Sequence, residues 1–89
     1  MSLQTSEQVD KLIEEWIEPN PQRPGAADVR LKDYGVPVWA LIGHLEVVNG
    51  DITQVARDYD ILGEAVDAAL AYYDRHKAVI DARIAANSA

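Results

Sequence analysis

The stretch from residue 52 to residue 70 constrains the fold more than any other, because it holds two short helical patterns joined by a tight turn. Asp51 is suited to an N-cap, and Gln54 stands three residues later, where a capping box places Gln or Glu. Asp60 marks a turn, and apolar residues resume at helical spacing from Val66 onward. The apolar positions are Ile52, Val55, Ala56, Tyr59, Ile61, Leu62, Val66, Ala69, Leu70 and Tyr73. This pattern predicts a helix-turn-helix.

Length and composition restrict the classes of function. A chain of 89 residues suits one small domain and leaves little room for a deep active-site cleft. Fifteen acidic residues against eight basic ones give a net charge of −7, which repels phosphate backbones. The absence of cysteine excludes disulfides and fits a reducing compartment. Because no apolar run approaches the roughly 18 residues of a membrane span, and no export signal opens the chain, we expect a cytoplasmic protein without membrane contact.

The N-terminal segment predicts an amphipathic helix followed by a proline-rich linker. Thr5 and Gln8 form a second capping-box pattern, and Pro19 is expected to end the helix. Residues 20–27 then contain Pro21, Pro24 and Gly25, which is typical of a semi-extended linker. The apolar face of the helix consists of Val9, Leu12, Ile13, Trp16 and Ile17. This face has to dock, either on the chain's own bundle or, through the tryptophan, on a second subunit.

Residues 28–34 alternate between apolar and charged side chains, the pattern of a short, half-buried strand. Val29 and Leu31 share one face, and Arg30 and Lys32 share the other. A single strand needs a partner, and we expect the same segment of a second copy to supply it. The two basic residues are either solvated charges or a phosphate-binding pair.

The next segment predicts a helix that is buried on most sides and forms the centre of the bundle. Pro37 is placed as its first residue, and Asn49 with Gly50 is expected to end it. Trp39 is the expected core anchor. His44 has no second histidine, cysteine or carboxylate at ligand spacing, so we expect a structural histidine and no metal site.

From Gly63 to Asn87 the pattern predicts one continuous helix of about 25 residues, roughly 37 Å long. That length exceeds a three-helix bundle of this size. The positions Val66, Leu70, Tyr73, Lys77, Ile80 and Ile84 follow heptad spacing. The end of the helix is either a solvated extension or part of a homodimer, which would cover Ile80 and Ile84. The expected dimer interface is Trp16, Val29, Leu31, Tyr73, Lys77, Ile80 and Ile84.

DNA binding by the helix-turn-helix is expected to be weak. The positions that would face the groove, early in its second helix, are Leu62, Gly63, Glu64, Asp67, Ala68 and Ala71. None is basic, and the two carboxylates repel phosphates, although a carboxylate can accept a hydrogen bond from cytosine. Attraction to DNA would depend on Arg30, Lys32, Arg57, Arg75 and Lys77. No nucleophile, paired catalytic residues or phosphate loop is recognisable, so we expect no enzyme and no cofactor.

A family resemblance spans about residues 28 to 75 and is carried by Val36, Pro37, Val38, Trp39, Gly50, Tyr59, Ala68, Ala69, Leu70, Ala71 and Tyr72. With these residues the chain resembles the bacterial family catalogued as domain of unknown function 433. The resemblance implies a homeodomain-like three-helix fold and an antitoxin of the VapB type, often encoded beside a PIN-like nuclease toxin. Many members carry Ile-Arg-Gly-Thr-Arg-Ile-Pro-Val before the first core helix. Here Lys32 matches one arginine and Gly35 replaces the other, which weakens a nucleic-acid role for this segment.

The sequence therefore predicts an all-α fold, a three-helix homeodomain-like helix-turn-helix bundle. Additions to it are an N-terminal helix, a short β-segment and a long C-terminal helix. Residues 1–27 form the N-terminal helix and linker, and residues 28–89 form the helix-turn-helix-like domain. The expected function is that of a non-enzymatic, antitoxin-like regulatory module that forms a homodimer, binds a toxin and, weakly, DNA. The alternative is a structural homodimeric interaction domain with no nucleic-acid role.

Overall fold

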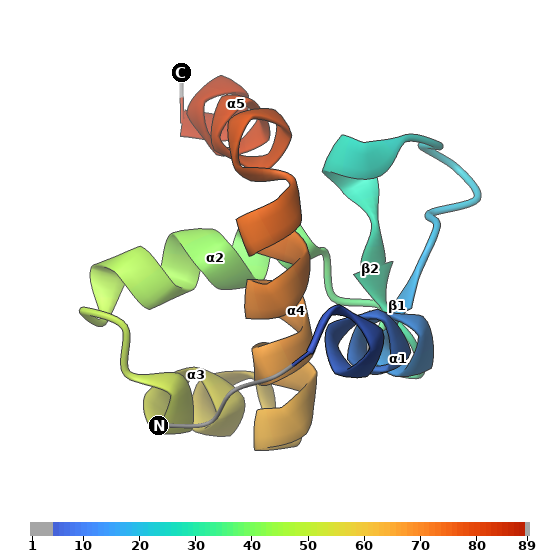
Figure 1. The fold of residues 1–89 in the computed structure, drawn as a ribbon. Coiled ribbons are helices and arrows are strands. Elements are labelled where there is room, and N and C mark those ends of the chain that lie inside the picture. The colour runs from blue at the N-terminus through green and yellow to red at the C-terminus, as the bar shows by residue number, and fades with distance from the viewer. Residues whose placement is uncertain (1–4, 89) are drawn as a thin grey trace.

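Five α-helices, two short strands and a 3-10 turn make up residues 5–88, the part of the chain that the computed structural model describes (Figure 1). The helices are α1 (Ser6–Trp16), α2 (Val38–Val47), α3 (Ile52–Tyr59), α4 (Gly63–Arg75) and α5 (Lys77–Ser88). The strands are β1 (Ile17–Glu18) and β2 (Arg30–Leu31), and the 3-10 turn η1 (Ala26–Asp28) precedes β2. α4 runs through the middle and contacts every other α-helix of this part. The prediction of a mostly helical chain with a short β-segment is confirmed.

α1 begins at the predicted capping box. The hydroxyl of Thr5 accepts a hydrogen bond from the backbone N–H of Gln8 at 3.1 Å, and the side-chain oxygen of Gln8 accepts one from the N–H of Thr5 at 2.8 Å. These bonds satisfy donors that a helix N-terminus leaves free. The helix ends at Trp16, before Pro19 is reached, because Ile17 is extended with φ −110° and ψ 136° and enters β1.

The predicted pairing of the strand with a second copy is wrong, because its partner lies in the same chain. β1 and β2 are antiparallel, with Ile17 opposite Leu31 and Glu18 opposite Arg30. The strand is also shorter than the predicted residues 28–34. A two-residue strand carries no alternation along the chain, so the sequence pattern could not reveal β1.

The two helices of the predicted helix-turn-helix, α3 and α4, begin at the predicted residues and are joined by a short turn. The Asp51 side chain accepts a hydrogen bond from the N–H of Gln54 at 3.1 Å and so caps α3. Asp60 takes a left-handed conformation, φ 55° and ψ 52°, and ends the helix, and the N–H of Ile61 donates to the carbonyl of Ala56 at 2.9 Å. α4 follows after a short turn.

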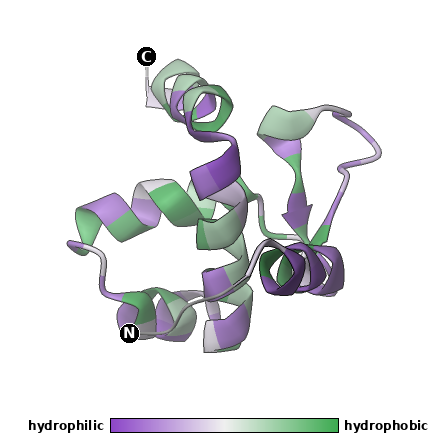
Figure 2. Ribbon diagram, in the orientation of Figure 1, coloured by the Kyte–Doolittle hydropathy of each residue, from purple (hydrophilic) through white to green (hydrophobic). Residues whose placement is uncertain are grey.

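The core lies where α2, α3 and α4 meet and extends to α5 and the strands. Its fully buried large side chains are Leu31, Val38, Leu41, Val55, Val66 and Ile80. The prediction that Trp39 anchors the core is wrong, since its ring is only partly buried and packs against the core from outside. Ile17 joins the same cluster, so the predicted segments 1–27 and 28–89 share one core. Figure 2 shows that hydrophobic and hydrophilic residues alternate along the helices, as burial of one face requires.

The predicted continuous C-terminal helix is wrong, because it breaks at His76. α4 ends at Arg75, α5 begins at Lys77, and His76 between them has φ −136° and ψ 36°. The turn brings α5 onto α2 and η1 (Figure 1), where Ile80 is fully buried. Burying an isoleucine side chain contributes about 1.5–3 kcal/mol, whereas a lost helical hydrogen bond costs about 1 kcal/mol. Burial therefore outweighs helix continuity.

Candidate functional site

α4, the second helix of the predicted helix-turn-helix, is poorly suited to enter a DNA groove. Glu64 and Asp67 are exposed on it, as expected from the sequence. The expectation that Ala68 also faces the groove is wrong, because Ala68 is fully buried in the core. α1 packs alongside α4, and Glu64, Asp67 and Ala71 line the hollow between the two helices. A duplex approaching this face would meet carboxylates and the neighbouring helix.

Two of the five basic candidates for DNA binding are engaged at the β-segment. The guanidinium of Arg30 donates to the carboxylate of Glu18 at 2.7 Å, next to the strand pairing. The ammonium of Lys32 donates to the backbone carbonyl of Glu14 in α1. Arg30 therefore joins β2 to β1, and Lys32 ties the residue that follows β2 to α1.

Two further candidates lie at the ends of α4 and α5. Arg75 pairs with the carboxylate of Asp10 and donates to the carbonyl of Ser6 at 3.3 Å, so it ties α4 to α1. The ammonium of Lys77 lies 5.9 Å from the centroid of the Tyr73 ring, a cation–π distance. Each cation is thus placed beside a group of its own chain.

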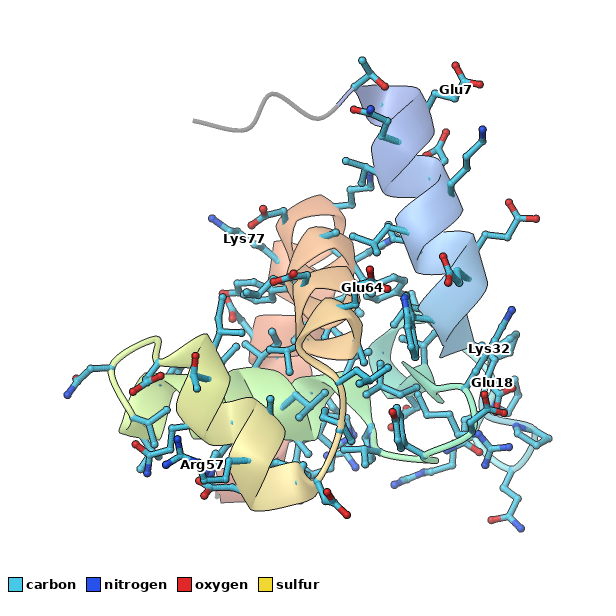
Figure 3. The ribbon with its side chains drawn as sticks, turned by 90° about the horizontal axis from the view of Figure 1, so that it is seen from below. Glu7, Glu18, Lys32, Arg57, Glu64 and Lys77 are labelled. Atoms are coloured by element: carbon cyan, nitrogen blue, oxygen red, sulfur yellow. The ribbon has the colours of Figure 1, made fainter. Side chains whose placement is uncertain are left out.

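The basic candidates do not share one surface. Figure 3 shows Lys32 near the end of α1, Lys77 beyond the far end of α4, and Arg57 on α3 at another edge of the molecule. Phosphate binding usually sums several cations along one face. The five basic side chains named from the sequence are therefore not assembled into a phosphate-binding patch.

The side chains expected at a dimer interface lie largely within the chain's own packing. Trp16 stacks on Tyr34 with ring centroids 6.4 Å apart, so its docking on the chain's own bundle, one of the two alternatives, is confirmed. The other apolar positions of that set also belong to the core or pack against it, namely Val29, Leu31, Tyr73, Ile80 and Ile84. Val29, Leu31 and Ile80 are thus buried without a second copy, whereas Trp16, Tyr73 and Ile84 are only partly buried.

Two tyrosines of α4 have raised pKa values for different reasons. The Tyr73 hydroxyl donates to the carboxylate of Asp81 at 2.8 Å, and this hydrogen bond raises the phenol pKa, with smaller contributions from desolvation and nearby negative charge. Burial raises the pKa of Tyr72, whose hydroxyl donates to the carbonyl of Ala26 at 2.7 Å. Both groups are hydrogen-bond donors that join segments of the fold.

His44 links two helices. Its Nε2 lies 2.8 Å from the Asp58 carboxylate, and its ring packs edge-on against Tyr59 with centroids 5.4 Å apart. The sequence pattern missed Asp58 because it lies on the next helix. Within residues 5–88, no three potential metal ligands of the His, Cys, Asp or Glu type gather in one place. No helix in the same range combines the length and the apolar character needed to cross a membrane.

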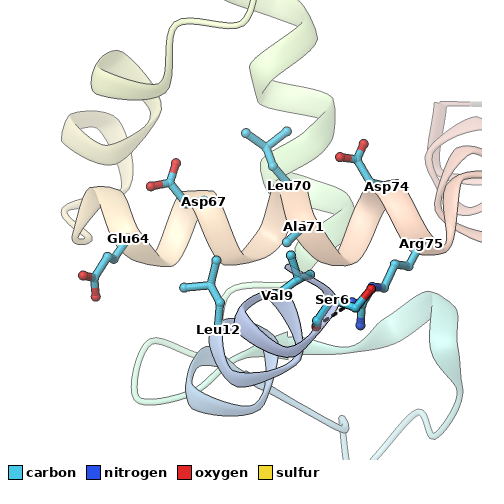
Figure 4. A pocket seen from close by; sticks show the side chains of 9 residues that line it. All are labelled: Ser6, Val9, Leu12, Glu64, Asp67, Leu70, Ala71, Asp74 and Arg75. Carbon is cyan, nitrogen blue, oxygen red and sulfur yellow. Dashed lines mark hydrogen bonds between the residues drawn. The ribbon is translucent and has the colours of Figure 1, made fainter. Parts of the chain in front are cut away.

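A groove of about 710 Å³ lies between α1 and α4 (Figure 4). Its apolar part comes from both helices, and its polar part comes mainly from carboxylates of α4. The residues of this α1–α4 groove are Ser6, Val9, Leu12, Glu64, Asp67, Leu70, Ala71, Asp74 and Arg75. At one end Arg75 reaches Ser6, as the dashed line in Figure 4 shows, and closes the groove.

Acidic and apolar side chains alternate along the groove face of α4. Asp67 and Asp74 project on the same side of the helix and flank Leu70 (Figure 4). Neither carboxylate, nor that of Glu64, takes part in an ion pair among residues 5–88. On its other side Leu70 also borders a mainly apolar hollow of about 390 Å³ next to Ile42 and Leu45 of α2. Leu70 is thus a partly exposed apolar position between two concave surfaces, with carboxylates around it.

The sequence did not reveal the α1–α4 groove, because the groove depends on how α1 crosses α4. A signal was available in the spacing of Asp67, Leu70 and Asp74, which places them on one helical face. Comparisons of the chain with family models, with curated proteins and with solved structures find no match. The family resemblance therefore stays a prediction from the residues that carry it.

Proposed function

We propose that the chain is a non-enzymatic regulatory module of the antitoxin type, and that its α1–α4 groove binds a basic segment of a partner protein. The observation that carries the proposal is the strip of Asp67, Leu70 and Asp74 along one groove, in a chain with a net charge of −7. The family resemblance adds the class of partner, a PIN-like nuclease. The proposal includes a homeodomain-like arrangement of the three core helices, α2, α3 and α4.

The two kinds of side chain in the groove would contribute differently to binding. Burial of apolar surface on Val9, Leu12 and Leu70 supplies about 1 kcal/mol for each 40 Å². An exposed ion pair supplies only about 0.2–1 kcal/mol, so the carboxylates mainly orient the partner and speed its approach. A nuclease needs a basic surface to hold its nucleic acid. An acidic module seated on that surface would compete directly with the substrate.

DNA binding remains a second and weaker part of the proposal. The first exposed carboxylates of α4 repel phosphates, and the basic candidates lie on separate surfaces. Any binding of DNA would therefore need basic residues of the partner protein to attract the phosphates, in addition to the basic residues of this chain. A gene for a PIN-like protein next to the gene for this chain would favour the antitoxin function, and its absence would favour the structural interaction domain.

Peptide binding tests the groove directly. The probe is a synthetic amphipathic helix of leucine and lysine, compared with a matched leucine–glutamate helix, by fluorescence anisotropy at low and high salt. We expect only the basic peptide to bind. The double variant Asp67→Asn, Asp74→Asn should weaken its binding about fivefold, since two exposed pairs supply about 1 kcal/mol.

A matched control separates the groove from overall charge. Glu14→Gln with Glu15→Gln removes the same charge from exposed positions of α1 that do not line the groove. Peptide affinity should change less than twofold in this control, and Leu70→Ala should weaken binding without any change in charge. Equal losses in the control and groove variants, or equal binding of both peptides, would contradict the proposed site.

A further inference from the structure

We propose that two copies of this chain exchange α5, so that the α5 of each copy packs on the α2 and η1 of the other. The inference goes beyond the proposed function, because the α1–α4 groove takes no part in it. Three observations carry it: the connection between α4 and α5, the surface that receives α5, and the helical character of the residues at the break.

The connection that would have to open is one residue long. α4 ends at Arg75 and α5 begins at Lys77, with only His76 outside both helices. The N–H of His76 donates to the carbonyl of Tyr73 at 3.0 Å, and α5 starts with the N–H of Ile80 donating to the carbonyl of His76, also at 3.0 Å. A change of backbone dihedral angles at this one residue would redirect the whole of α5.

Nothing in the local sequence requires the break. Sharp helix kinks nearly always occur at proline, at glycine–serine pairs, at π-bulges or where a side chain or water is inserted into the helix. Residues 64–88 contain neither glycine nor proline. Straightened at His76, α4 and α5 would form one helix of about 26 residues, roughly 39 Å long. That helix is the one the heptad spacing predicts.

The surface that receives α5 belongs to an earlier part of the chain. Ile80 is fully buried, and α5 packs mainly on α2 and η1. The guanidinium of Arg83 donates to the carboxylate of Asp28 in η1 at 3.0 Å, and both side chains are about four-fifths buried. The same guanidinium lies 4.4 Å from the centroid of the Trp39 ring. When α5 leaves, this surface needs an apolar and cationic helix, which a second copy supplies in its own α5.

Exchange keeps these contacts and alters only the hinge and the number of molecules. Each copy gains helical hydrogen bonds at His76, and the pair loses the freedom of two separate chains. Domain exchange is favoured where a hinge is short. Because each chain carries a net charge of −7, added salt should increase the dimer fraction.

The decisive experiment combines two charge-reversed variants. In Arg83→Asp and in Asp28→Arg, the contact between α5 and η1 places like charges together, both within one chain and in an exchanged homodimer. In an exchanged heterodimer, both contacts regain opposite charges. After the variants are unfolded together in urea and refolded, native mass spectrometry should detect a heterodimer at least tenfold above either homodimer. A mixture that refolds only to monomers overturns the proposal.

A second pair controls for charge. Arg30→Glu and Glu18→Arg reverse an ion pair of similar length, 2.7 Å, whose two residues do not lie on α5. Exchange of α5 cannot restore this pair between copies, so their mixture should show no preference for the heterodimer. An equal preference in the control mixture would mean that another segment is exchanged and would overturn the assignment to α5.

Hinge variants test the proposal with the contact surface of α5 intact. His76→Ala and His76→Gly both remove the ring that stacks on Tyr72 at 4.2 Å, but alanine favours a helix and glycine disfavours it. The dimerisation constant, measured by light scattering after refolding over a range of concentrations, should be higher for His76→Ala than for His76→Gly, by about fivefold for each of the two hinges. A dimer fraction that is equal in the two variants, or higher with glycine, overturns the proposal.

Discussion

Replacing Ile80 by alanine tests the position of α5 most directly, because Ile80 is fully buried and lies on the segment whose direction the sequence did not predict. An isoleucine-to-alanine change in a packed core costs about 2–5 kcal/mol, from lost burial and the cavity that remains. A central value of about 3 kcal/mol is expected here. A domain of this length has a stability of about 9 kcal/mol, so the variant should still fold at 25 °C.

The loss converts into a change in the midpoint of thermal unfolding. For 89 residues the entropy of unfolding is about 190 cal/mol/K, so about 3 kcal/mol lowers the midpoint by about 16 °C. Circular dichroism melts of dilute protein measure this value. Val79→Ala is the matched control on the same helix, because Val79 is 41% exposed, and its effect should stay within about 0.5 kcal/mol. A decrease of less than about 5 °C for Ile80→Ala would refute the packing of α5 described above.

Three further predictions concern the cap of α3, the exposed carboxylates of α4 and the Tyr73 hydroxyl. Asp51→Ala removes the cap of α3 and should cost about 1 kcal/mol, measurable by urea unfolding, whereas Asp51→Ser should retain most of the stability. Glu64→Gln with Asp67→Asn should strengthen DNA binding in anisotropy titrations and increase its salt dependence; unchanged affinity would show that duplex does not approach α4. Asp81→Asn should lower the pKa of Tyr73 toward 10.0 in ultraviolet titrations, because the hydrogen bond from the phenol to the Asp81 carboxylate stabilises the protonated form of the tyrosine. Because the pKa of Tyr73 is higher in the folded state than the ordinary value of 10.0, the hydrogen bond to Asp81 contributes its full stability below pH 10.0. This contribution to stability is lost as the pH rises through the pKa of the folded state.

Local signals in the sequence were sufficient for the starts of two helices and for one turn. The Thr5 and Asp51 caps depend on residues three positions apart, and the turn at Asp60 depends on a side chain that tolerates a left-handed backbone. Each of these features is decided within one helical turn. They were therefore predictable without knowledge of the rest of the fold.

The features that were missed depend on contacts between distant segments. Opposite Leu31 stands Ile17, in a strand too short to show a pattern, and the break at His76 is stabilised by burial of Ile80 on α2 rather than by any residue at the break. Helix propensity alone favours the continuous helix, and tertiary packing overrides it.

Of the candidate site, only its acidic character could be foreseen. The sequence identifies Glu64 and Asp67 as groups that repel phosphate. Their position in a groove could not be predicted, because the groove forms only where α1 packs on α4. Asp74 belongs to the same strip. The concave shape is a property of two packed helices, and no single stretch of sequence contains it.

The short ladder between β1 and β2 has a consequence for how the chain tolerates changes in length. It ties together the two ends of the segment from Pro19 to Val29, whose middle residues, Pro21 to Gly25, are exposed. Once the ends of a loop are held, doubling its length costs only about 0.6 kcal/mol. The tip of this segment, near Gln22 and Arg23, is therefore the place where extra residues, a tag or a small inserted domain can be carried with the least disturbance to the helices.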